Sequence, residues 1–188
     1  MVELVADLAW GWRMDSVLAD MAGPESERLR ERPGEVVLVL ERPDDGIWLH
    51  TKGFYPPGTW RLPTGGLKHG EAPDVGYVRE LAEETGIVPA PPPRRLAVVR
   101  YAATTGERYA FASYLYRVPG VGEPPRAADA SEDITGWRAV PPAELDRVAA
   151  DLRRLPDGWR PWGEFRAVAH EVLAAIRRRD LPSQEGDT

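Results

Sequence analysis

The sequence predicts an α/β protein built as one domain. Three observations support this class: short aliphatic segments typical of strands, a loop-and-helix unit at residues 65–87 that lies among them, and two helical segments near the carboxyl end. This order of strands and helices differs from that of a helical bundle. With 188 residues, of which 43% are hydrophobic and 29% charged, the chain is long enough to bury one sizeable core.

The first segment is expected to be helical. Apolar residues recur at roughly helical spacing from about Leu4 to Met21, and core packing or a contact with a second subunit explains such a stripe. A Gly-Pro pair then ends the pattern, and residues 25–32 are expected to form a charge-rich connector. We therefore expect a helical extension at residues 1–32, ahead of the main domain at residues 33–180.

Two strands are expected before the loop-and-helix unit. Residues 36–40 are all Val or Leu, and glycine and proline bound them. Residues 47–52 form a second candidate strand, and the turn residues Asp44, Asp45 and Gly46 join it to the first. The chain then reaches the unit through a loop that is rich in proline and aromatic residues.

The loop-and-helix unit carries signals for both ends of its helix. Pro73 suits the first helical position, and Gly86 suits a left-handed cap after the last turn. At about 100° per residue, Val75, Val78 and Leu81 fall on an arc that is expected to pack against a sheet. A second arc, expected to face a cleft, carries three acids: Glu80, Glu83 and Glu84.

These three acids predict a metal site. They are three or four positions apart on one helix surface, where like charges cost stability unless a cation compensates them. Hard divalent cations take oxygen ligands and often share them with substrate phosphates. The chain has no Cys, and its three histidines lack ligand spacing. Gly76 lies on the same arc, where glycine costs roughly 1 kcal/mol relative to alanine, so we expect another backbone, such as the Gly65-Gly66 loop, to pass close to it.

Three strands and two helices are expected after the unit. Residues 96–103 and 109–116 form a candidate hairpin around a turn that contains glycine, and a last strand is expected at residues 134–140. One helix is expected from Pro141 to about Leu155 and another over residues 162–178, where apolar residues share one face. The polar tail at residues 181–188 is expected to be disordered.

Composition restricts the partners. The formal net charge of -6 argues against a broad nucleic-acid surface, because phosphate backbones are bound mainly by clustered Lys and Arg. The absence of Cys fits a reducing compartment, and the start of the chain lacks the basic region and the long apolar run of a signal peptide or membrane span. We therefore expect a cytoplasmic protein without a membrane segment, and a small anionic ligand as its partner.

The unit matches a known motif at every fixed position. The Nudix box is the pattern G-x5-E-x7-R-E-U-x-E-E-x-G-U, in which U is an aliphatic residue. The residues that meet it are Gly65, Glu71, Arg79, Glu80, Leu81, Glu83, Glu84, Gly86 and Ile87. The chain thus resembles the Nudix hydrolases. The resemblance implies an α/β/α sandwich with a mixed central sheet, and a pyrophosphohydrolase in which water attacks phosphorus of a diphosphate linked to another group.

The resemblance also implies roles for the box residues. Glu80, Glu83 and Glu84 would hold Mg²⁺ or Mn²⁺, with the Gly65 carbonyl as an additional ligand. These ions would neutralise charge on the phosphates and position water. Arg79 would orient a box glutamate through a salt bridge, and Glu71 would support the site.

The general base is expected to be Glu83. Glu132 or Asp133 is expected to help it, because an acid just before the last strand resembles the position from which the family often brings a further carboxylate to the metals. A capping role is the alternative for both residues. His50, His69 and His170 are expected to be ordinary surface or core histidines.

The substrate stays open at this stage. Arg100 is a candidate for binding phosphate, and Trp60 and Tyr55 are candidates for stacking on a base; a surface charge and core packing are the respective alternatives. Thr64 stands where many family members carry another glycine, and subfamily markers beyond the box are absent. A nucleoside diphosphate linked to another group, or a nucleoside triphosphate, is the leading class.

Two rival functions remain. One is a catalytically silent Nudix module that binds a nucleotide and regulates a partner, and the intact set of acids counts against it. The other is an RNA 5′-end pyrophosphohydrolase, and the acidic balance counts against it. Family habit and the apolar amino-terminal segment suggest a homodimer.

Overall fold

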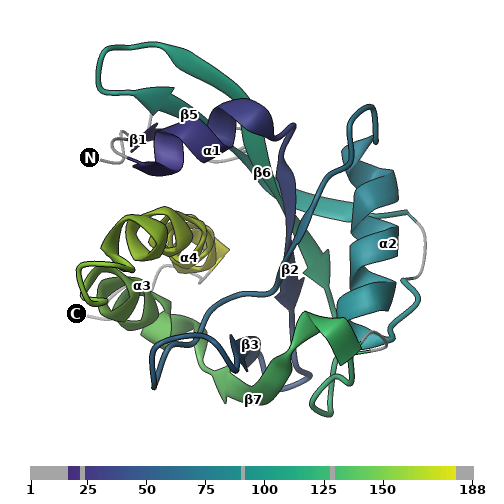
Figure 1. Cartoon of the computed structure of the whole chain (residues 1–188). Coiled ribbons are helices and arrows are strands. Elements are labelled where there is room, and N and C mark those ends of the chain that lie inside the picture. The colour runs from purple at the N-terminus through teal and green to yellow at the C-terminus, as the bar shows by residue number, and fades with distance from the viewer. Residues whose placement is uncertain (1–16, 22–23, 90–91, 128–129, 181–188) are drawn as a thin grey trace, which may run out of the picture.

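A mixed sheet lies between two layers of helices (Figure 1). The computed structural model describes residues 17–21, 24–89, 92–127 and 130–180. Within these residues, five strands form the central sheet in the order β1-β5-β6-β2-β4. Their bounds are β1 Val17–Met21, β2 Glu35–Leu40, β4 Thr64–Gly66, β5 Arg94–Ala103 and β6 Arg108–Val118. The pairs β1/β5 and β6/β2 are parallel, whereas β5/β6 and β2/β4 are antiparallel.

Helices cover both faces of this sheet, which confirms the predicted α/β/α sandwich. The helix α2, Pro73–Thr85, packs on one face. The other face carries three helices: α1 Pro24–Glu31, α3 Leu145–Arg153 and α4 Arg160–Asp180. The apolar core is split in the same way, because Val37 and Val39 of β2 point to the α3/α4 side and Val36 and Leu38 point to the α2 side.

The amino-terminal segment differs from its prediction. The stripe from Leu4 to Met21 ends in a strand, β1, which pairs in parallel with β5; residues 4–16 lie outside the described residues. The expected connector at 25–32 is instead the helix α1, with Pro24 at its start. Leu29 of α1 is buried in the core, and Arg30 lies over the Tyr109 ring at 5.1 Å, so tertiary contacts hold this charged helix in place. The boundary at residue 32 stays a prediction.

A separate two-stranded ribbon closes one end of the sandwich. It pairs β3, Ile47–Lys52, with β7, Ile134–Val140, in antiparallel register. Alternate residues face opposite sides: Leu49 contributes to the core under α3 and α4, whereas Trp48 contributes to the core under α2. The short 3-10 helix η2, Ala130–Glu132, leads into β7. A second one, η3 at Pro142–Glu144, leads into α3.

The remaining predicted elements are confirmed with small shifts. The β5–β6 hairpin turns at Gly106, which has a left-handed φ of 85°. The turn after β2 includes Asp45, with a φ of 63°. The predicted tail at 181–188 lies outside the described residues. None of the described helices combines the length and the apolar character that crossing a membrane requires.

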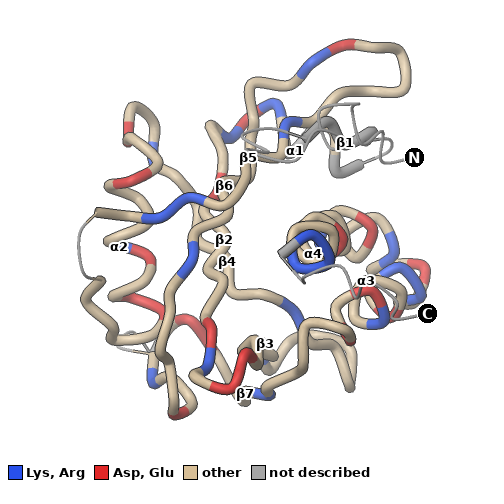
Figure 2. The backbone as a smooth tube through the Cα atoms, turned by 180° about the vertical axis from the view of Figure 1, so that it is seen from behind, with Lys and Arg blue, Asp and Glu red and all other residues tan. Residues whose placement is uncertain are grey.

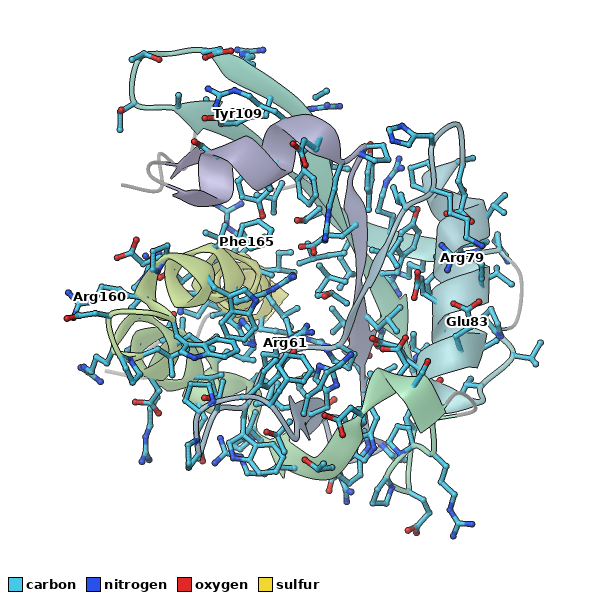
Figure 3. The ribbon with its side chains drawn as sticks, in the orientation of Figure 1. Arg61, Arg79, Glu83, Tyr109, Arg160 and Phe165 are labelled. Atoms are coloured by element: carbon cyan, nitrogen blue, oxygen red, sulfur yellow. The ribbon has the colours of Figure 1, made fainter. Side chains whose placement is uncertain are left out.

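A buried polar network joins the box strand β4 to α4. Arg166 of α4 donates to Glu35 at 2.6 Å and to the Thr64 hydroxyl at 3.2 Å. Arg61, which Figure 3 shows in the interior, donates to Thr64 at 2.9 Å and to the Tyr55 hydroxyl at 2.8 Å. The Leu62 N–H donates to Nε2 of His170, also on α4, at 3.0 Å. The last helix therefore fixes the chain on which the box begins.

Two buried histidines differ in their bonding. Burial lowers the pKa of His170 to about 4 and the pKa of His50 well below its usual value. Nδ1 of His170 lies 2.9 Å from the Arg166 carbonyl, and its other ring nitrogen accepts from Leu62. Neither ring nitrogen of His50 has a hydrogen-bond partner among the described residues.

This difference predicts opposite effects of removing each ring. His50→Leu is expected to leave stability at pH 7 unchanged or to raise it, whereas His170→Leu strands the Leu62 N–H and should cost about 1–3 kcal/mol. Both folded-state pKa values are depressed, so the unfolded chain binds more protons, and wild-type stability should fall as the pH drops below about 6.5. Each variant should reduce that fall. Urea unfolding between pH 4 and 8 measures this, and equal losses at pH 7 would contradict it.

Candidate active site

Gly65 and Glu80 form the tightest contact of the site. A Cβ atom built on Gly65 would lie 2.0 Å from the Glu80 carboxyl carbon, so only glycine leaves room for that carboxylate. Gly65 is held in β4 opposite Val36 of β2. The helix α2 then starts at Pro73 and ends at Gly86, whose N–H donates to the Ala82 carbonyl from a left-handed φ of 70°. Both predicted ends of the helix are therefore confirmed.

The face that α2 buries is only partly the predicted one, because Leu81 is buried as expected but Val75 and Val78 are not. Val75 and Val78 are 59% and 42% exposed, whereas Glu80 and Glu84 are 7% and 1% exposed. The reason is Tyr77, which is buried and stacks on Tyr116 of β6 with ring centroids 4.5 Å apart. With Tyr77 held in this stack, two acids of the helix, Glu80 and Glu84, are buried instead of lining an open cleft.

Gly76 is also explained differently from the prediction. A Cβ at Gly76 would lie 2.3 Å from Leu67 Cδ2 and 3.2 Å from a Glu71 oxygen. The neighbour that passes close is thus a side chain of the loop after Gly65-Gly66, and not the loop backbone.

Arg79 holds the box acids together. Its guanidinium donates to both oxygens of Glu71 at 2.9 and 2.8 Å, to Glu80 at 2.6 Å and to Glu83 at 2.9 Å. It also donates to the Gly66 carbonyl at 2.9 Å, which ties the helix to the loop. Figure 3 shows Arg79 and Glu83 on the same helix, α2. The hydrogen bonds from Arg79 hold the pKa of Glu71 well below its usual range.

Lys52 supplies the second cation of the site. Its Nζ lies 2.7 Å from Glu132 and 4.0 Å from Glu84. Lys52 comes from the end of β3 and Glu132 from η2, so the ribbon brings a distant acid to α2. Figure 2 shows acidic positions gathering where α2 and the segment before β7 meet.

Burial shifts the protonation of the two inner acids. It raises the pKa of Glu80, and it raises the pKa of Glu84 to about 8 despite the opposing charges of Arg61 and Lys52. One oxygen of Glu84 has no hydrogen-bond partner among the described residues. An acid that is buried, incompletely bonded and close to other carboxylates is the kind of group that a bound cation would stabilise.

The donors fit a hard divalent cation in kind. They are carboxylate oxygens, with the Gly65 backbone directly beside Glu80. Arg79 and Lys52 form ion pairs with these carboxylates and compensate part of their charge. Among the described residues, no three acids or histidines are grouped around one point where a metal could bind.

The other predicted residues lie elsewhere. Tyr55 is buried against Trp159 and Trp162 and accepts a hydrogen bond from Arg61, so its ring belongs to the packed interior. Arg100 is exposed on β5, opposite Ala112 of β6. Trp60 lies in a hollow on the far side of the ribbon. The structure does not bring these three side chains to the carboxylates, and their roles in substrate binding stay predictions.

Asp133 was a candidate from the sequence, whereas Lys52 and Arg61 were not. Asp133 has a left-handed φ of 52°, and its carboxylate fills the space beside Gly53. Lys52 and Arg61 were missed, since a basic residue at a strand end and another before the box carry no sequence signal of their own. Only the pairing of β3 with β7 reveals that Lys52 reaches Glu132.

The chain is similar to known proteins of one family. The family model described as NUDIX domain matches residues 31–162. An RNA pyrophosphohydrolase of Zymomonas mobilis is 35% identical over 75 residues, which are 40% of this chain and 45% of that protein. One of Hahella chejuensis is 26% identical over 162 residues, 80% of this chain and 91% of that protein. The chain spans less than half the length of the first curated relatives that it matches.

A solved structure supports the fold. The MutT protein from Methanosarcina mazei superposes with a TM-score of 0.54 at 16% identity, over 81% of this chain and 99% of that one. At this identity the likeness concerns the architecture alone.

Proposed function

Because this chain belongs to the Nudix family, we propose that it is a pyrophosphohydrolase that cleaves the P–O–P bridge of a nucleoside diphosphate linked to another group, or of a nucleoside triphosphate. The observation that carries the proposal is the burial of Glu80 against Gly65 and of Glu84 near Lys52, where one Glu84 oxygen lacks a hydrogen-bond partner among the described residues. In the reaction, a water oxygen bonds to phosphorus, the bridging P–O bond breaks, and the leaving phosphate departs with the bond electrons.

In this proposal the box carboxylates supply both the metal ligands and the general base. Glu80, Glu83 and Glu84, with the Gly65 carbonyl, would hold Mg²⁺ or Mn²⁺, which would supply charge neutralisation at the phosphates. Glu83 accepts the proton from water, which its position fits: its side chain is 43% exposed, whereas Glu80 and Glu84 are buried. Arg79 orients Glu80 and Glu83, and Glu71 anchors Arg79.

Two glutamine substitutions test the base. Glu83→Gln should abolish hydrolysis, because an amide cannot accept the proton. Glu132→Gln keeps the size of the side chain but removes the charge that Lys52 pairs with, and a smaller loss of kcat is expected if Glu132 only helps. Initial rates with Mg²⁺ and with Mn²⁺ measure both. An active Glu83→Gln variant would exclude Glu83 as the base, and an unaffected Glu132→Gln variant would remove Glu132 from the mechanism.

RNA 5′ ends are the second candidate substrate. The relatives named RNA pyrophosphohydrolase favour this candidate, since two of them are 35% and 42% identical to parts of this chain. The net charge of -6 argues against a broad nucleic-acid surface. A panel of nucleoside triphosphates, sugar-linked nucleoside diphosphates and 5′-triphosphorylated RNA, assayed for phosphate release, separates the candidates. Tight binding without turnover of any member would favour the silent regulatory module.

Assembly and location are part of the same proposal. We expect a homodimer in the cytoplasm. A monomeric mass in solution at micromolar concentration would refute the dimer, and cell fractionation checks the location.

A further inference from the structure

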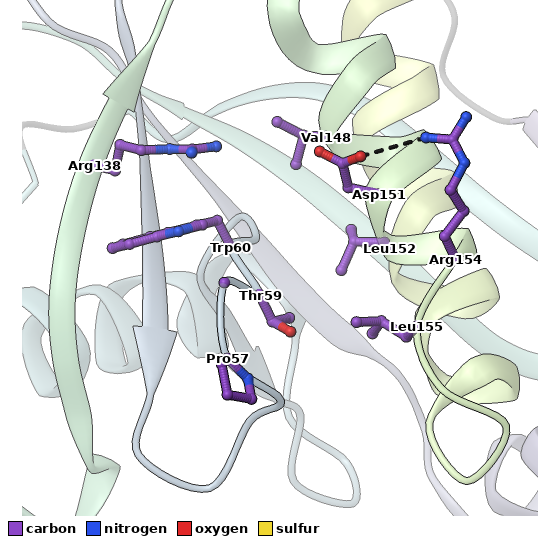
Figure 4. A pocket seen from close by; sticks show the side chains of 10 residues that line it. Pro57, Thr59, Trp60, Arg138, Val148, Asp151, Leu152, Arg154 and Leu155 are labelled. Atoms are coloured by element: carbon purple, nitrogen blue, oxygen red, sulfur yellow. Dashed lines mark hydrogen bonds and ion pairs between the residues drawn. The ribbon is translucent and has the colours of Figure 1, made fainter.

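A hollow of about 220 Å³ lies between the loop before the box, β7 and α3. Figure 4 shows its lining: Arg138 lies over the Trp60 ring, and Val148, Leu152 and Leu155 of the α3 region face them. Thr59 lies beneath Trp60, and Asp151 stands at the α3 side. The volume is below the roughly 300 Å³ at which pockets for drug-sized ligands begin, so it suits one small group.

The ribbon separates this hollow from the box carboxylates. Arg138 is paired with Leu49, and both lie on the face turned to α3 and α4. Lys52 is three residues after Leu49 on β3, so its side chain points to the other face, where it reaches Glu84 and Glu132. The hollow is therefore a site of its own.

Two polar groups of the hollow, the Arg138 guanidinium and the Thr59 hydroxyl, lack a hydrogen-bonding or charged partner among the described residues. The Arg138 guanidinium lies 5.2 Å from the Trp60 ring centroid, and no carboxylate among the described residues pairs with it. Thr59 is 3% exposed, yet its hydroxyl has no hydrogen-bond partner in the described part of the chain. A buried hydroxyl without a partner is costly, and Thr59 is one of the residues that line the hollow.

The chemistry of the lining favours a flat, uncharged heterocycle over a phosphate. Val148, Leu152 and Leu155 give the hollow an apolar side, and the Asp151 carboxylate is paired with Arg154 at 3.4 Å. A guanidinium plane and an indole ring are the surfaces on which bases stack. The Thr59 hydroxyl both donates and accepts, which suits the edge of a base.

We propose that this hollow binds a single nucleobase, with Trp60 and Arg138 providing the stacking surface and Thr59 the hydrogen bond. The site stands on its own geometry and holds whether or not the carboxylates hydrolyse a pyrophosphate. It gives Trp60 the role in base stacking that its sequence position suggests, at a place remote from the metal ligands.

Direct titration tests the proposal without hydrolysis. Adenosine, guanosine, cytidine and uridine should each shift the Trp60 indole N–H signal in NMR spectra recorded without divalent cation, with dissociation constants of about 1 mM. The signal is assigned with Trp60→Phe. Inorganic phosphate and ribose 5-phosphate should leave it unchanged. Shifts with phosphate alone, or none with any nucleoside at 10-fold higher concentration, roughly 10 mM, would overturn the proposal.

Variants locate the site. Arg138→Ala should weaken nucleoside binding at least fivefold, whereas Arg108→Ala, an equal charge change on the β5–β6 hairpin, should not. Thr59→Val keeps the shape, so it should weaken binding while the melting temperature stays or rises. Wild-type affinity in Arg138→Ala and Thr59→Val would overturn the assignment. Glu84→Gln should bind nucleosides as the wild type does, and lost binding there would show that the hollow and the carboxylate site are one.

Discussion

Replacing Glu84 with glutamine is expected to lower kcat/KM by a factor of about 100 or more, since even partners of metal ligands cost 10–100-fold when removed. The metal-free fold should tolerate the change. Burial raises the Glu84 pKa to about 8, so at pH 7 the folded chain already holds a proton there, and an amide resembles that neutral acid. Steady-state kinetics with Mg²⁺ and cation binding by calorimetry measure the effect.

The same residue predicts a pH effect on the metal-free chain. Because its folded-state pKa is raised from 4.5 to about 8, the folded state binds more protons than the unfolded state within that window, and stability should fall as the pH rises through it. Glu84→Gln should remove this fall. Glu171→Gln, at a surface pair with Arg153, is the matched control and should keep both the activity and the pH slope. Wild-type turnover in Glu84→Gln would contradict the assignment of Glu84 as a metal ligand.

Arg79→Ala is expected to destabilise the cation-free protein by about 2 kcal/mol, between the values for buried and surface pairs. Three carboxylates lose their shared partner, and Glu71 and Glu80 are largely buried. A divalent cation at 100 times its dissociation constant should then restore about 2.7 kcal/mol. Thermal unfolding with and without Mn²⁺ tests both statements.

A surface arginine provides the control for that experiment. Arg153→Ala removes a pair at 2.9 Å in which both partners are about one-third exposed, so it should cost less than about 1 kcal/mol. Mn²⁺ should stabilise this variant by the same amount as it stabilises the wild type. Equal losses in both variants, or an Arg79→Ala loss that Mn²⁺ does not relieve, would mean that Arg79 is structural and does not substitute for a cation.

The sequence predicted what depends on local spacing. The limits of α2 follow from Pro73 and Gly86, and the proximity of Glu80, Glu83 and Glu84 follows from helical geometry. The order of strands and helices was sufficient for the layered α/β class.

Features that depend on partners distant in sequence were not predictable. The rotation of α2 is set by the Tyr77–Tyr116 stack, and an apolar arc drawn through Val75 and Val78 cannot anticipate it. The strand β1 exists because β5 offers it an edge, and α1 persists through the contacts of Leu29 and Arg30. Lys52 joins the site only through strand pairing.

The contacts of α4 with the box strand indicate how much of the chain is needed to hold that strand in place. The family match stops at residue 162, yet Arg166 and His170 beyond that limit hold Thr64 and Leu62. A fragment trimmed to the matched region would lose the hydrogen bonds that hold the chain at Leu62 and Thr64. A fragment that keeps the box strand in place should therefore include α4 at least as far as His170.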